Sequence, residues 1–131
     1  MKIKGIVFCS AMLAFVAQAE DAAEKAFTDE VVQCAAYYEI SSQMIGAMNA
    51  PQMQAVGDRL KVSAVDAKSL AEQYREPSQV KQDLDAAKEL QMAKLSGGNN
   101  LGVLMRQYKD LCKQVVYSPK DRLEYWAMAT M

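Results

Sequence analysis

The side chains that could do chemistry are few in this chain. The sequence contains no histidine, which removes the commonest general base and the commonest transition-metal ligand. It contains three cysteines, and if Cys34 and Cys112 form a disulfide the only thiol left is Cys9, close to the N-terminus. Serine–histidine and cysteine–histidine mechanisms are excluded on this composition. We therefore predict that the protein is not an enzyme.

Carboxylates are the remaining candidates for acid–base catalysis. A pair of acidic residues, one of them desolvated, is enough to hydrolyse a glycosidic bond. Most acidic residues in the middle of the chain, such as Asp58 and Asp66, fall on the polar faces of predicted helices, and we interpret them as solvated surface. Glu39 lies beside two tyrosines in a segment expected to be buried. For Glu39 too, the sequence favours a side chain turned towards solvent over a tuned acid.

Methionines gather around one predicted interhelical turn. Met44, Met48 and Met53 lie close together in the sequence, and thioethers are ligands for Cu(I). However, no histidine or free cysteine completes such a site, and methionine is a flexible filler of hydrophobic cores. We therefore predict no metal site and no cofactor, and a Met-based copper-binding protein remains the weakest of the functional alternatives.

Three residues near the C-terminus belong to the types that dominate binding hot spots. Arg122, Tyr125 and Trp126 occupy a short predicted helix that has little core to hide them. They are our candidate partner-binding residues. The competing interpretation, which the sequence favours slightly, is that Trp126 plugs the open end of a helical bundle.

The N-terminus has the three regions of a secretory signal peptide. Positive charge at Lys2 and Lys4 is followed by an uncharged, mostly apolar run over 5–16 and then by Ala17-Gln18-Ala19. The run is shorter than the roughly 20 residues that span a bilayer as a helix. We expect residues 1–19 to be the signal peptide, cleaved after Ala19, and the mature protein to be periplasmic or secreted.

The mature chain, residues 20–131, is predicted to be a single domain with an acidic balance. Two of the 15 basic residues lie in the signal peptide, so 13 basic residues face 16 acidic ones and the net charge is −3. This composition gives no electrostatic case for binding nucleic acid or an anionic membrane, and no stable membrane anchor is expected after cleavage.

The two cysteines of the mature chain are expected to pair. Phe8 stands where a lipoprotein signal places a small residue, so Cys9 is expected to leave with the signal peptide. Cys34 and Cys112 are then the only intramolecular pair, and an oxidising compartment favours a disulfide. This disulfide would close a loop of nearly the whole domain. By chain-entropy estimates it would raise the free energy of unfolding by about 4–5 kcal/mol.

The hydrophobic pattern predicts helices only. Apolar residues alternate at spacings of four and three from Phe27 to Met48, which indicates one long helix that starts at Thr28 or extends back into 22–26. Pro51, Pro77 and Ser118-Pro119 are helix-start signals, and the last is expected to be capped by Ser118. A break over Ser96–Asn100 is expected to end the third helix with a glycine cap and to cap the fourth with Asn100.

The fold class predicted is all-α: a small antiparallel four-helix bundle plus a short C-terminal helix that acts as a lid. Consecutive helices joined by short connections alternate in direction, so the first and fourth are antiparallel neighbours. Cys34 lies in the first half of the first helix and Cys112 in the second half of the fourth. Antiparallel packing brings these positions level, as a disulfide requires.

We expect an exported, non-enzymatic helical interaction protein of the bacterial envelope that binds a protein partner. An inhibitor or immunity-type protein is the first form considered, by analogy of architecture alone. The alternatives are a periplasmic stress chaperone, although the repeated Leu-Thr-x-x-Gln element of cradle-shaped chaperones is missing, and a copper-binding protein. A homo-oligomer is left open by the sequence.

Overall fold

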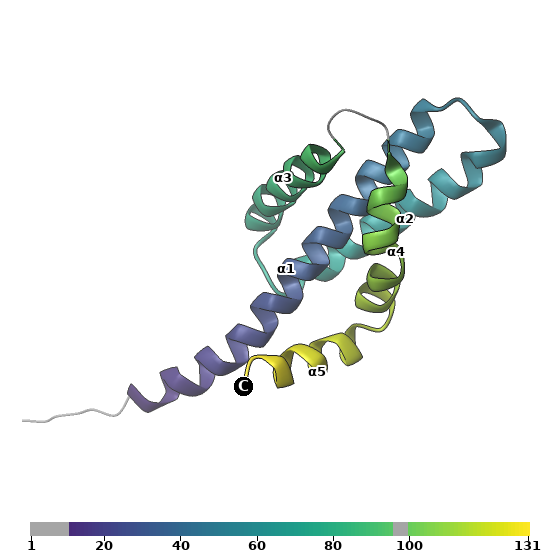
Figure 1. The fold of residues 1–131 in the computed structure, drawn as a ribbon. Helices are drawn as coiled ribbons and strands as arrows, with labels where there is room; N and C mark the ends of the chain where they lie inside the picture. The colour runs from purple at the N-terminus through teal and green to yellow at the C-terminus, as the bar shows by residue number, and fades with distance from the viewer. Residues whose placement is uncertain (1–10, 96–99) are drawn as a thin grey trace, which may run out of the picture.

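The computed structural model describes the backbone of residues 11–95 and 100–131, with side chains from Ala22 onward. Within these residues the chain forms helices joined by short connections and has no strand, as the sequence predicts. Five α-helices and one 3₁₀ turn follow each other in the order α1 (Ala11–Ala47), η1 (Pro51–Met53), α2 (Gln54–Glu72), α3 (Pro77–Lys94), α4 (Leu101–Tyr117) and α5 (Pro119–Ala129) (Figure 1).

The long helix α1 is the spine of the fold, and α2, α3, α4 and α5 all pack against it (Figure 1). Its middle is apolar nearly all the way round, which is typical of a helix buried on several sides. The predicted single stripe of apolar residues therefore describes only one of its contact faces. Its buried apolar residues between 31 and 40 are Val31, Val32, Cys34, Ala35, Ala36, Tyr37, Tyr38 and Ile40.

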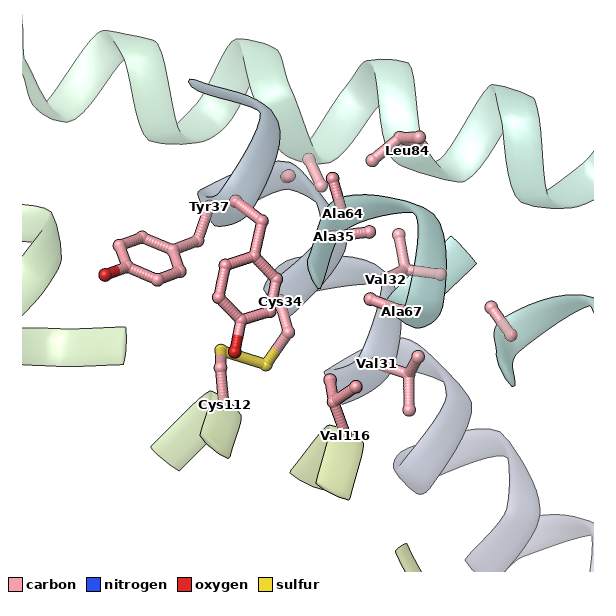
Figure 2. Close-up of a cluster of buried hydrophobic side chains, with 14 of the residues drawn as sticks. Val31, Val32, Cys34, Ala35, Tyr37, Ala64, Ala67, Leu84, Cys112 and Val116 are labelled. Atoms are coloured by element: carbon pink, nitrogen blue, oxygen red, sulfur yellow. A yellow bond between two sulfur atoms is a disulfide. The ribbon is translucent and has the colours of Figure 1, made fainter. Parts of the chain in front are cut away.

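Helix α2 lies close against α1 because the residues at the contact are small. Ala64, Ala67 and Ala71 are buried there, and Figure 2 shows the first two beside the α1 side chains. At the turn end of the pair, a Cβ atom added to Gly57 would lie only 3.3 Å from Cγ2 of Ile45. The close approach of the two helices thus depends on side chains that barely protrude.

The disulfide between Cys34 of α1 and Cys112 of α4 is formed, as the sequence predicts (Figure 2). The two Cα atoms are 5.4 Å apart and both side chains are completely buried. The rings of Tyr37 and Tyr108, from the same two helices, stack with centroids 5.7 Å apart. The covalent tie and its aromatic neighbours together fix α4 against α1.

Helix boundaries differ from the prediction where side-chain capping was expected. Thr28 does not start α1, since the helix runs through it and its hydroxyl donates to the Glu24 carbonyl at 2.6 Å. Ser118 and Asn100 precede α5 and α4 as expected, but neither side chain makes a capping hydrogen bond. Pro119 begins α5 as predicted.

The connections that follow α1 and α3 were also predicted from the sequence. Asn49 adopts a left-handed conformation, with φ 51°, just after α1, and the expected second helix begins with the 3₁₀ turn at Pro51. The predicted glycine cap, for which the sequence offers Gly97 and Gly98, lies outside the described residues. None of the helices in the described part of the chain has the length and apolar character needed to cross a membrane.

Candidate functional site

The three candidate partner-binding residues lie on α5 and are organised around one carboxylate of α1. Arg122 donates from Nε to Oε1 of Glu30 at 2.7 Å and from Nη2 to Oε2 at 2.8 Å. The indole Nε1 of Trp126 donates to the same Oε1 at 2.9 Å. The Glu30 and Arg122 side chains are only 12% and 15% exposed. This bidentate pair, one turn of α5 before the indole contact, anchors the helix to α1.

Aromatic contacts complete this anchor. The Arg122 guanidinium lies 4.1 Å from the centroid of the Tyr125 ring and 5.6 Å from that of Trp126. The two rings meet edge to face with centroids 5.2 Å apart. The hydrogen bonds to Glu30 raise the pKa of Arg122 above its usual value, so the cation is permanent. Arginine is therefore held by a carboxylate on one side and by rings on the other.

The structure thus separates the three residues that the sequence grouped. Arg122 and Trp126 face α1, and Trp126 packs against the hydrophobic core beside that helix. Tyr125 is 50% exposed, and Met128, one turn later, is 74% exposed. We call the exposed side of α5, formed by Asp121, Glu124, Tyr125 and Met128, the α5 outer face. A partner of this helix would meet Tyr125 and Met128 first.

Glu30 and Met128 are the members of this region that the sequence reasoning missed. A helix that starts at Thr28 would have Glu30 in its first turn, whereas α1 continues well beyond it towards the N-terminus. Its partner Arg122 is 92 residues away, and no local pattern connects them. Met128 could have been found, because it follows Tyr125 at a spacing of three on the same helix face.

A second cluster joins α2 and α4 through hydroxyl groups and lies beside Tyr38 of α1. The Tyr117 hydroxyl donates to Oδ2 of Asp66 at 2.7 Å and lies 3.0 Å from the Ser63 hydroxyl. Burial raises the pKa of the neighbouring Tyr38 to about 12, and burial also raises the pKa of Tyr117. These phenols are therefore protonated at physiological pH and are poorly suited to act as bases or nucleophiles. The cluster is a polar link between helices.

A surface cavity of about 470 Å³ lies beside the connection between α2 and α3. At its wall, Arg75 donates to Asp29 of α1 at 2.9 Å and to Asp83 of α3 at 2.8 Å, and only 16% of its side chain is exposed. Arg75 forms ion pairs with both carboxylates, so it links the α2–α3 connection to α1 and α3.

Glu39 and Met44, which the sequence raised as a candidate acid and a candidate copper ligand, take part in contacts within the fold. Glu39 pairs with Lys88 of α3 at 2.9 Å and is partly buried, so it is neither fully solvated nor an isolated acid. Met44 packs against the core, whereas Met48 is exposed. Across the described residues no group of histidine, cysteine or acidic side chains could hold a metal ion.

Comparison with known proteins adds no further assignment. No protein-family model, no curated protein and no solved structure matches this chain. The role of the site therefore rests on its own geometry.

The Glu30–Arg122 pair should contribute more to stability than an exposed ion pair. We expect Arg122→Ala to lower the free energy of unfolding by about 2–3 kcal/mol, because it leaves a largely buried carboxylate without its partner. The control is Lys81→Ala, which breaks the exposed pair with Asp85 and should cost less than about 1 kcal/mol. Urea unfolding of both variants measures the difference. Equal losses would show that the α5 anchor contributes no more than a surface contact.

The buried tyrosines predict a loss of stability in alkali. Below pH 10 Tyr38 is protonated in both folded and unfolded chains, but between pH 10 and about 12 only the unfolded chain loses the proton. The free energy of unfolding should therefore fall as pH rises through this range. Tyr38→Phe should make the fall shallower than in the unmodified protein. An identical slope in the two proteins would contradict the assignment.

Proposed function

We propose that this protein is an exported, non-enzymatic helical interaction protein of the bacterial envelope, which binds a partner protein through the α5 outer face. Export is proposed from the signal-peptide pattern of residues 1–19. The Cys34–Cys112 disulfide is compatible with a location outside the cytoplasm. An interaction role is favoured because the sequence has no histidine and because Cys34 and Cys112 are joined in the disulfide.

The observation that carries the proposal is the way α5 is held. This helix contains no fully buried residue, so it adds little to the hydrophobic core, yet it is fixed to α1 by a largely buried, bidentate ion pair. The same arginine packs on Tyr125 and restricts that ring without covering it. A rigid, half-exposed aromatic side chain loses little conformational entropy on binding. The α5 outer face is therefore preorganised for contact.

The form of interaction proposed first is that of an inhibitor or immunity-type protein. Such a protein needs a stiff surface and a fold that survives outside the cell, and it needs no reactive groups. The disulfide and the α1 spine supply the stiffness (Figure 1). This choice among binding proteins follows from architecture, and its partner is a protein.

Site-specific photocrosslinking tests the proposal in cells that export the protein. A benzophenone amino acid replaces Tyr125 in one variant and, as the control, Leu90 in another, because Leu90 is an exposed apolar residue of α3. We expect one dominant protein adduct from position 125 that is absent from position 90 and is lost when Met128→Glu is added. Adducts that are absent from position 125, or the same from both positions, would contradict binding through the α5 outer face.

A further inference from the structure

Charge is distributed unevenly among the helices of this acidic protein. Helices α2, α3 and α5 each carry equal numbers of acidic and basic side chains. Helix α4 carries three basic side chains and a single acidic one, Asp110. The excess of positive charge on α4 is therefore a property of one helix and is hidden in the overall composition.

The three basic residues of α4 lie on one face. Arg106, Lys109 and Lys113 are spaced i, i+3 and i+7, which places them within one arc of an α-helix over about 10 Å of its length. All three are exposed, and we call them the basic stripe. The opposite side of the helix is buried and includes Leu104 and Cys112. The disulfide and the core therefore hold the basic stripe outward in a fixed orientation.

No ion pair within the described chain involves the basic stripe, and the one acidic residue beside it on α4 is Asp110, four residues after Arg106. None of the three basic side chains makes a hydrogen bond to another described residue, whereas Glu39 and Glu30 of α1 are paired with α3 and α5. Lys109 and Lys113 are also like charges one turn apart, an arrangement that destabilises a helix by a few tenths of a kcal/mol. Helix α4 thus keeps an excess of two positive charges, three basic residues against Asp110, that no ion pair ties to another described helix.

We infer that the basic stripe docks an acidic surface of a partner protein, an inference that rests on the proposed function as a protein-binding module. The partner surface is expected to be acidic because its carboxylates would form ion pairs with the basic stripe that the described chain does not provide. Met105 and Tyr117, exposed side chains of the same helix, belong to types enriched at protein interfaces. A stripe of three cations is too small for an extended polyanion, since residues 20–131 carry 13 basic against 16 acidic residues and a net charge of −3.

A designed helical peptide that carries glutamates at i, i+3 and i+7 on one face is the probe. The reference is a peptide of identical composition with its glutamates spread around the helix. Fluorescence anisotropy with the disulfide-bonded mature protein should show tighter binding of the first peptide, with an affinity that falls as salt rises. The triple variant Arg106→Glu, Lys109→Glu, Lys113→Glu should bind it at least about tenfold more weakly.

The matched control is the triple variant Arg59→Glu, Lys61→Glu, Lys68→Glu, which reverses one arginine and two lysines, all exposed, on α2. It should bind the peptide within about twofold of the unmodified protein, because salt screens charges that lie outside the interface. Equal weakening by both triple variants, or equal binding of the two peptides, would overturn the inference. So would tighter binding of single-stranded DNA or phosphatidylglycerol vesicles, or a salt-sensitive dimer that depends on the basic stripe.

The peptide assay and the crosslinking assay test different surfaces, so a negative result in one leaves the other informative. If Tyr125 yields no adduct while the peptide binds only with the basic stripe intact, α4 is the docking face and the proposed contact through α5 is wrong. If Tyr125 yields a specific adduct while the peptide result is negative, the proposed function stands and the docking role of the basic stripe is wrong.

Discussion

The bond between Cys34 and Cys112 is the constraint on which the arrangement of α1 and α4 depends. It spans 78 positions of sequence and encloses α2 and α3 within one covalent loop. Because the unfolded chain is restricted by the same loop, the bond favours the folded state mainly through chain entropy. Both surfaces argued to bind partners follow from this tie, since α4 carries the basic stripe and leads directly into α5.

Much of the fold could be predicted from the sequence because its determinants are local. Prolines 51, 77 and 119 mark helix starts, and apolar spacing marks the helices between them. The disulfide followed from the cysteine count and an expected oxidising compartment. What failed was capping at Thr28, Asn100 and Ser118. Helix α1 runs through the buried Thr28, where packing outweighs the local start signal. Helices α4 and α5 begin without a capping hydrogen bond from the Asn100 or Ser118 side chain.

The candidate site was harder to predict because its meaning depends on distant partners. The residue types at Arg122, Tyr125 and Trp126 suggested binding, but only the fold shows that Glu30 holds two of them inward and leaves the tyrosine exposed. The basic stripe was missed for a related reason. Charges of both signs are mixed along the sequence, and the imbalance emerges only when they are counted helix by helix and their ion pairs are assigned.

The most direct test of the account is the stability of the mature protein with and without its disulfide. Removal of both thiols by Cys34→Ala with Cys112→Ala should lower the free energy of unfolding by about 4–5 kcal/mol, less any strain released from the native state. Urea unfolding measures this loss, and mass spectrometry of the protein isolated without reducing agent shows whether Cys34 and Cys112 are free. Both of these thiols free, or an unchanged free energy of unfolding in the double variant, would contradict the central role of the bond.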